Sequence, residues 1–166
     1  MTWKNHRILT FAMVYAVTGY LAGAVISMLA STLPDRLEMG IIPHRTYTHW
    51  VLPALGLLYA CHKWTLAHPG IQAQIAFYLL LGYCAHLLQD SFSKSGIPFI
   101  FPRKTYGANF YITRRMSETL VVIVALGGLG LYCQQKGYLD KNYLKKEAEE
   151  IQIVMEDIYY FATKNR

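Results

Sequence analysis

The sequence predicts an all-α, polytopic membrane protein with about four transmembrane helices and a C-terminal amphipathic helix. Hydrophobic residues make up 54% of the 166 residues and charged residues only 16%, against roughly 25% charged residues in typical soluble domains. The apolar residues are gathered into four long runs with short polar connections. After the fourth run, apolar residues recur every three or four positions among charges, which is the pattern of an amphipathic helix.

Each of the four apolar runs is a candidate membrane span. A helix needs about 20 predominantly apolar residues to cross about 30 Å of hydrocarbon. The first and third runs are long enough, whereas the second and fourth are short and are expected to be tilted or partly shielded by protein. The runs are Ile8–Ser31, His49–Trp64, Ile71–Asp90 and Met116–Cys133.

Small residues mark the fourth run, which contains Gly127, Gly128 and Gly130. Glycine lets the backbone of a neighbouring helix come close, so we expect a tight helix–helix contact there. The three cysteines also lie in apolar runs. Without a CxxC pair they predict neither a disulfide framework nor a thiolate metal site.

Four spans would place alternate connections on opposite faces of the membrane. Residues 32–48 and 91–115 then share one face, and the N-terminus and the tail share the other. His6, His62 and His68 belong to that other face and are not expected to bind metal. The first face gathers carboxylates and imidazoles from separate helices, namely Asp35, Glu38, His44, His49, His86, Asp90 and Glu118.

These side chains predict a transition-metal site, because imidazole and carboxylate together suit zinc, manganese or iron. His86 and Asp90 are four residues apart at a helix end, so they share a face. His44 and His49 are five apart, about 140° around a continuous helix, and converge only if the loop after Pro43 is irregular. One or two ions are expected, with zinc preferred. The expected ligands are Asp35, His44, His49, His86 and Asp90.

The same face supplies groups for catalysis. A bound metal lowers the pKa of water to about 7 and yields hydroxide as a nucleophile. Glu118 is the first candidate for a general base, whereas Glu38 is expected to be an ordinary interfacial carboxylate. Arg45 and Lys94 would offset phosphate charge in the transition state. Further cations could bind substrate, with membrane anchoring at the headgroup level as an equal alternative: Arg103, Lys104, Arg114 and Arg115.

The formal net charge of +6 points to lipid rather than to nucleic acid. The basic residues form no single tract, and several lie beside apolar runs. Anionic lipid headgroups are the natural partners of cations in that position. Membrane lipids are therefore the expected partners, and nucleic acid is not expected.

The segment after residue 136 is expected to be an amphipathic helical tail attached to a membrane domain of residues 1–136. Three roles stay open for it: packing on its own membrane domain, pairing with a second copy or a partner protein, and lying on the membrane surface. Its apolar stripe consists of Leu144, Ala148, Ile151, Met155, Ile158 and Ala162.

The motifs in the middle of the chain resemble those of the YdjM-like family of bacterial inner-membrane, metal-dependent hydrolases. They are Pro34-Asp35, the H-R-x-x-T-H string 44–49, the H-x-x-x-D-x-x-x-K-S-G-x-P string 86–98 and Arg-Arg-Met-Ser-Glu at 114–118. The resemblance implies a multi-pass helical protein of the bacterial inner membrane with metal-binding His and Asp residues. The chain departs from the family pattern at two places: Arg36 and Leu37 follow Asp35, and Trp50 follows the second histidine of the 44–49 string.

Two classes of function follow. The first is a membrane-embedded, metal-dependent hydrolase that acts on a phosphoester of a lipid or lipid-linked substrate. The alternative is a non-enzymatic metal-binding scaffold or a subunit of a larger membrane assembly. A metal-free phosphatase with a nucleophilic histidine is disfavoured, because the chain lacks the Pro-Ser-Gly-His string that is typical of such enzymes.

Overall fold

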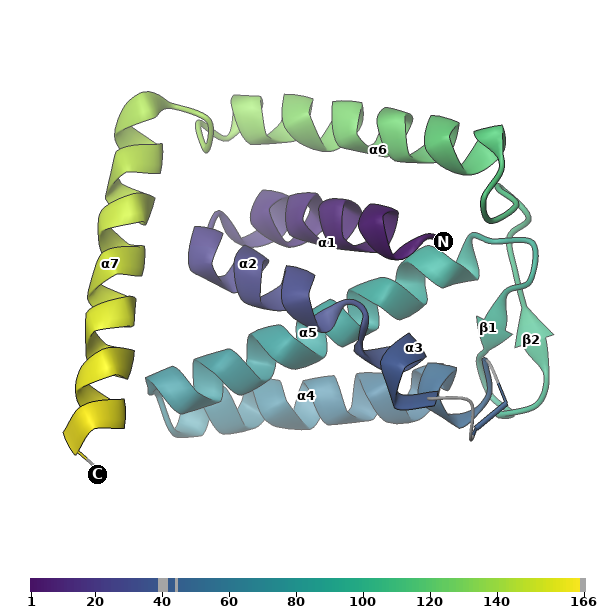
Figure 1. Ribbon diagram of the computed structural model, residues 1–166, viewed down its shortest axis with the longest axis horizontal. Helices are drawn as coiled ribbons and strands as arrows, with labels where there is room; N and C mark the ends of the chain where they lie inside the picture. Colours follow the sequence, from purple (N-terminus) through teal and green to yellow (C-terminus); the bar gives the residue numbers. More distant parts are fainter. Residues whose placement is uncertain (39–41, 44, 165–166) are drawn as a thin grey trace.

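The computed structural model describes residues 1–38, 42–43 and 45–164, and these form a bundle of helices with a small β-hairpin at one end (Figure 1). The predicted all-α class is confirmed in that most of the chain is helical. The helices are α1 (Trp3–Thr18), α2 (Leu21–Ala30), α3 (Leu33–Glu38), α4 (Val51–Ala67), α5 (Ile71–Ser91), α6 (Met116–Gln135) and α7 (Lys141–Lys164), with a 3-10 turn η1 (Tyr47–His49). The hairpin pairs β1 (Ile97–Pro98) with β2 (Thr105–Tyr106) in antiparallel register.

The first apolar run is not one span but a hairpin of two helices. The backbone of Gly19 has φ of +68°, and its N–H donates to Tyr15 O at 2.7 Å, which ends α1 in a left-handed cap. Glycine is favoured in this conformation because it has no Cβ. The chain then reverses, and α2 packs back against α1. The expectation of a single span over Ile8–Ser31 is therefore wrong.

This turn also moves the N-terminus to the opposite end from the one expected. The N-terminal amino group of Met1 lies 2.9 Å from Asp90 Oδ1, and Asp90 is at the C-terminal end of α5. His6 is fully buried beside it. The prediction that the N-terminus and His6 lie on the face away from the candidate ligands is wrong, because the turn at Gly19 adds one reversal.

Among the described residues, two helices are long and apolar enough to cross a membrane: α5 and α6. The expected number of about four is not reached. The turn at Gly19 divides the first run into two shorter helices, and α4 contains only 17 residues. The run Met116–Cys133, which was expected to be short for a span, lies in α6, and this helix is long and apolar enough to cross a membrane.

The tight helix contact lies between α2 and α5 rather than at the glycines of α6. A Cβ on Gly82 would clash with the backbone of Ser27, and one on Gly23 would clash with the ring of Tyr78. A Cβ on Gly127 or Gly128 would meet no atom within 4 Å. The expected close approach at those α6 glycines is therefore absent from the described structure.

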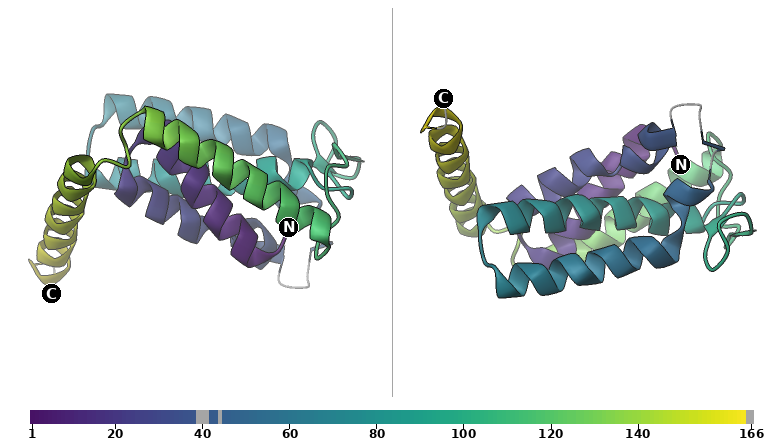
Figure 2. Two further views of the ribbon diagram at one scale, coloured as in Figure 1. Left: turned by 90° about the horizontal axis from the view of Figure 1, so that it is seen from above. Right: turned by 90° about the horizontal axis from the view of Figure 1, so that it is seen from below.

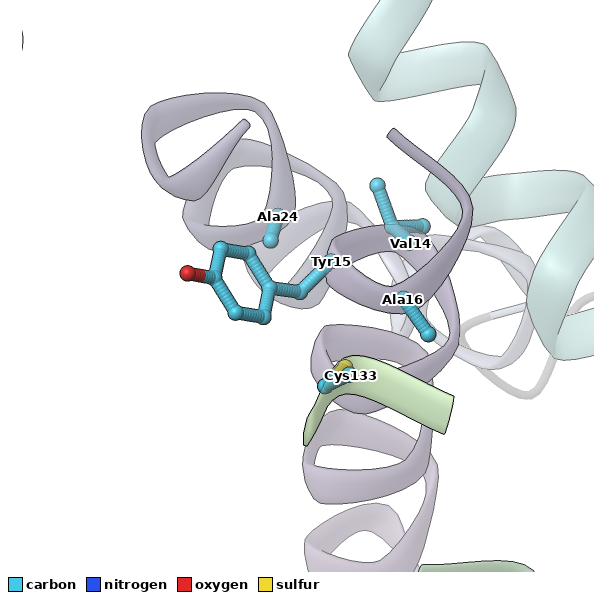
Figure 3. Close-up of a cluster of buried hydrophobic side chains, with 5 residues drawn as sticks. All are labelled: Val14, Tyr15, Ala16, Ala24 and Cys133. Carbon is cyan, nitrogen blue, oxygen red and sulfur yellow. The ribbon is translucent and has the colours of Figure 1, made fainter. Parts of the chain in front are cut away.

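A buried apolar cluster holds the far end of the bundle together (Figure 3). It joins side chains of α1, α2 and α6. Such close-packed apolar contacts fix the relative positions of helices. Buried polar side chains such as His86 and Asp90 lie at the other end of the bundle, beside the hairpin. The buried members are Val14, Tyr15, Ala16, Ala24 and Cys133.

Helix α7 lies across the far end of the bundle, away from the hairpin (Figures 1 and 2). Its attachment is polar: Glu147 Oε2 accepts from Leu21 N at 2.7 Å, and the Tyr143 hydroxyl donates to Gly19 O at 2.9 Å. Leu144 and Met155 of the expected stripe are exposed. The stripe members at 158 and 162 have side chains outside the described set. The expected roles of the tail in pairing or in membrane binding stay predictions.

Candidate metal centre

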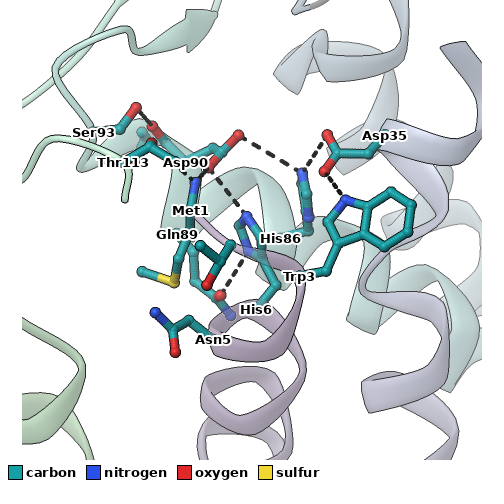
Figure 4. Close-up of polar contacts among 12 residues, drawn as sticks. Met1, Trp3, Asn5, His6, Asp35, His86, Gln89, Asp90, Ser93 and Thr113 are labelled. Carbon is teal, nitrogen blue, oxygen red and sulfur yellow. Dashed lines mark hydrogen bonds and ion pairs between the residues drawn. The ribbon is translucent and has the colours of Figure 1, made fainter. Parts of the chain in front are cut away.

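Helices α3 and α5 and the turn η1 meet at the hairpin end of the bundle, and Figure 4 shows Asp35, His86 and Asp90 there. Helix α5 brings His86 and Asp90, which are one turn apart, and both side chains are buried. Asp35 comes from the first turn of α3, where the helix dipole favours a carboxylate. His49 ends the turn η1. Side chains from separate parts of the sequence thus converge on one buried point.

Three possible ligand atoms, from Asp35, His49 and His86, lie close together at this point, and an oxygen of Asp90 is near both imidazoles. The Nε2 atoms of His49 and His86 are 3.2 Å apart. Asp35 Oδ1 is 3.3 Å from the first nitrogen and 3.6 Å from the second. Asp90 Oδ2 is 3.8 Å from both. Ligands about 2.0–2.1 Å from a tetrahedral zinc ion are about 3.3 Å from one another, so the spacing of the Asp35, His49 and His86 atoms suits one ion, with Asp90 slightly farther away.

Glu38 orients His49 from behind. Glu38 Oε1 lies 2.9 Å from His49 Nδ1, and it accepts from the Thr48 hydroxyl at 2.7 Å and from Arg45 N at 2.9 Å. A carboxylate on one imidazole nitrogen keeps the proton there and leaves the other nitrogen as a lone pair. Glu38 is buried, so its expected role as an ordinary interfacial carboxylate is wrong. Thr48 bonds to Glu38 and does not cap a helix.

Trp3 holds Asp35. The indole Nε1 donates to Asp35 Oδ2 at 2.9 Å, and Oδ1 lies 3.3 and 3.6 Å from the Nε2 atoms of His49 and His86. Burial raises the pKa of Asp35, but His49 and His86 outweigh it and hold that pKa well below its usual range. Asp35 Oδ1 is itself buried and has no hydrogen-bond partner within the described part of the chain. An ionised, buried oxygen of this kind favours a bound cation.

Arg45 is held on Asp90. Its Nη2 lies 3.0 Å from Asp90 Oδ2, while Nη1 donates to Ser93 Oγ at 2.8 Å and to Gly96 O at 2.9 Å. The backbone of Arg45 has φ of +60°, an uncommon conformation for a residue with a side chain. Arg45 therefore links the loop before η1 to the loop after α5.

His6 forms a second group with His86 and Asp90. Its ring stacks on His86 at 3.9 Å between centroids. Gln89 donates its amide N–H to Thr10 Oγ1 at 2.8 Å, so its carbonyl oxygen accepts from His6 Nδ1 at 2.9 Å. The Nε2 lone pair then faces Asp90 Oδ1 at 3.3 Å. Burial lowers the pKa of His6, against the opposing effect of Asp90.

The sequence reasoning missed His6 because hydropathy does not register the reversal between α1 and α2. The signal that could have found it is the Thr18-Gly19 pair, since glycine after an apolar helix is the usual helix stop. If the first helix ends at Gly19, the chain reverses and the end of α2 lies on the same side as the start of α1. His6 in α1 is then expected near Asp35, which follows α2.

Glu118 joins the start of α1 to the start of α6. Its Oε1 accepts from the backbone N–H and the hydroxyl of Thr2 at 2.8 and 3.0 Å, and also from the Asn5 amide. Its Oε2 accepts from Arg114 N at 2.7 Å. Glu118 is in neither group of described ligand atoms.

Two of the predicted cations, Arg45 and Arg114, line a polar cavity. This cavity has a volume of about 710 Å³, and its lining includes Asp35, Arg45, Asp90 and Arg114. The remaining predicted cations are exposed, and the Lys104 ammonium lies 5.5 Å from the centre of the Tyr106 ring. The exposed ones are Lys94, Arg103, Lys104 and Arg115. The predicted ligand His44 lies outside the described residues.

The comparisons with known proteins give one match. A family model described as YdjM inner membrane protein matches residues 1–153. The matched segment contains both groups of ligand atoms and both candidate membrane helices. No curated protein and no solved structure matches the chain significantly.

Proposed function

Because the chain belongs to the YdjM inner membrane protein family, we propose that it is a multi-pass, metal-dependent hydrolase of the bacterial inner membrane. Its substrate is a phosphoester of a lipid or of a lipid-linked molecule. One observation supports the proposal: Asp35 Oδ1 and the Nε2 atoms of His49 and His86 lie 3.2–3.6 Å from one another, close to the ligand separations of a tetrahedral zinc site, and Asp90 Oδ2 lies 3.8 Å from both imidazoles.

The donor set fits zinc, with manganese and iron as alternatives. Asp35, His49, His86 and Asp90 would hold the ion, and His44 remains a further candidate ligand. When bound, such an ion supplies Lewis-acid activation of water and substrate at neutral pH. Glu38 and Trp3 orient the ligands from behind, as outer partners do in metal sites.

Cations at the cavity suit a phosphate group. Arg45 and Arg114 both line the polar cavity beside the ligands, and a guanidinium can bind two phosphate oxygens at once. Arg45 already contacts Asp90, so it is positioned to offset charge next to the metal. Lys94, Arg103, Lys104 and Arg115 are exposed around the same end and would attract an anionic headgroup.

The geometry favours a positioning role for Glu118 over that of a general base. Four donors converge on its two carboxylate oxygens. An acceptor with its lone pairs engaged is poorly placed to accept a further proton. Its removal is expected to loosen the start of α1, which carries Trp3 and His6.

The decisive test is the metal content of purified full-length protein after growth with added zinc. We expect about one zinc ion per chain, lost in His86→Ala and in Asp90→Ala. His62→Ala is the matched control, because His62 lies on α4 outside the described ligand groups. Protein without bound transition metal, or metal that survives both substitutions, would exclude the proposal. Release of phosphate from phosphatidic acid by the zinc-loaded protein then tests hydrolysis.

A non-enzymatic role in a larger assembly is the second candidate. The observation that favours it is the second half of α7, where Ile153, Met155 and Tyr159 are exposed. Exposed apolar side chains on an unpartnered helix are typical of interaction surfaces. A stoichiometric partner in pull-downs, lost when residues 150–166 are removed, together with bound zinc and no turnover, would support this candidate.

A further inference from the structure

An apolar groove runs along the bundle between α1, α5 and α6. Its volume is about 600 Å³, within the range of about 300–1,000 Å³ that ligand pockets usually have. Helix α6 packs on α1 (Figure 2), and residues of α6 form one wall of the groove. The lining includes Leu9 and Met13 of α1, Leu88 of α5, and Val124 and Gly128 of α6.

The groove adjoins the polar cavity at the metal centre. Met1 lines both of them, and Gln89 of the groove is followed directly by Asp90 of the cavity. A hydrogen bond holds the backbone where the groove and the cavity meet: the buried Tyr111 hydroxyl donates to Gln89 O at 2.9 Å. A single molecule could therefore place a polar group among the cavity residues and an apolar group in the groove.

The groove runs alongside two candidate membrane helices. Its lining on α6 extends from Leu120 to Leu129, which is about 13 Å of helix at about 1.5 Å per residue. Both α5 and α6 are candidate membrane helices, so the groove lies alongside segments that would be in hydrocarbon. A ligand chain could enter it sideways from the bilayer without crossing water.

We propose that this groove binds the hydrocarbon chain of a membrane lipid whose phosphate headgroup occupies the polar cavity. The headgroup part rests on the proposed function, and the chain part rests on the groove. The apolar groove lies next to a cationic, carboxylate-lined cavity, with Met1 lining both. This arrangement favours an amphiphilic lipid over a second protein helix, which has no phosphate to place there. The proposed enzyme therefore takes long-chain phosphoesters rather than small soluble ones.

Gly128 gives the means of testing this. It lines the groove, and a Cβ added to it would meet no atom within 4 Å. Larger side chains at this position would therefore extend into the space that the lipid chain occupies. Gly127 is equally unobstructed but does not line the groove. It is a matched control, since both replacements lie in the interior of α6 and change helix propensity alike.

The experiment uses full-length protein in lipid nanodiscs with phosphatidic acid that carries a photoreactive group in the middle of one acyl chain. Labelled peptides are mapped by mass spectrometry. We expect labels on the groove face of α6, reduced about tenfold, equivalent to about 1.4 kcal/mol, in Gly128→Trp and less in Gly128→Leu. Gly127→Trp should label like wild type. Unlabelled phosphatidic acid and polyprenyl phosphate are added in separate arms, so that competition identifies the type of chain.

The outcomes separate this inference from the proposed function. Labels spread over all faces of α6, or undiminished in both Gly128 variants, would overturn the inference even if the protein releases phosphate. Equal turnover of glycerol 3-phosphate and phosphatidic acid, unaffected by Gly128→Trp, would overturn it too. Groove labelling that persists in His86→Ala, in a protein with no turnover, would support lipid binding while the hydrolase proposal fails.

Discussion

His49 Nε2 and His86 Nε2 face each other at 3.2 Å, with a carboxylate oxygen on either side. Glu38 on Nδ1 of His49 leaves the Nε2 lone pair of that ring facing this space. A metal ion bound here would accept that lone pair together with the neighbouring carboxylate oxygens.

Glu38→Gln is expected to weaken zinc binding by about 10–100-fold, the usual effect of losing an outer partner of a metal ligand. The carboxylate of Glu38 keeps the proton on His49 Nδ1, and the amide would do so less well. A competition titration against a chromophoric chelator measures the change. Glu149→Gln, on the exposed face of α7, is the control. An unchanged affinity for Glu38→Gln would mean that His49 is not a ligand.

Zinc affinity should fall as the pH is lowered, because both imidazoles must lose their protons to bind the ion. Competition between protons and the ion for the ligand nitrogens sets the slope of this fall. Asp35 does not contribute to this slope. Burial raises the pKa of Asp35, but its imidazole neighbours outweigh burial, so the carboxylate stays ionised. Titrations at several pH values measure the slope. Asp35→Asn should lower affinity at every pH and leave the slope unchanged.

Gly19→Ala should destabilise the protein by at least about 1–2 kcal/mol, the usual cost of a left-handed conformation for a residue with a Cβ. The added methyl group would also meet the Tyr138 ring and the Tyr143 hydroxyl. Denaturation in mixed micelles measures the change in the free energy of unfolding. Gly56→Ala, in an open position of α4, should instead stabilise by up to about 1 kcal/mol. Similar values for both would show that the turn at Gly19 is not formed.

Glu118→Gln should reduce the free energy of unfolding by about 1–3 kcal/mol, because buried donors lose their charged acceptor. The donors are the backbone N–H groups of Thr2 and Arg114 and the polar side chains near them. The zinc content should stay unchanged. Loss of turnover without loss of stability would instead make Glu118 the general base.

The sequence was sufficient for those parts of the site that depend on local spacing. His86 and Asp90 share a helix face because four residues complete about one turn, and Asp35 and His49 follow from the ends of apolar runs. Each of these places a group at a helix end, where hydropathy changes sharply. The candidate site was therefore recognisable without its three-dimensional geometry.

The remainder depended on features that hydropathy does not express. Gly19 lies between apolar segments, so a reversal of the chain leaves the apolar run unbroken in composition. For this reason the sequence did not indicate that Trp3 and His6 lie at the candidate site. Glu38 differs from its expected role for another reason: the Arg45 N–H and the Thr48 hydroxyl, seven and ten residues further along the chain, both donate to it. Hydropathy does not register hydrogen bonds of this kind.

The reversal at Gly19 has a practical consequence for anyone who handles this protein. Because the Met1 amino group lies against Asp90, a purification tag or fluorescent reporter fused ahead of it would have to pass through the mouth of the polar cavity. The end of α7 lies at the other end of the bundle (Figure 1). Fusions placed there would leave the cavity open, and loss of metal with the first kind of fusion alone would be an artefact of the tag.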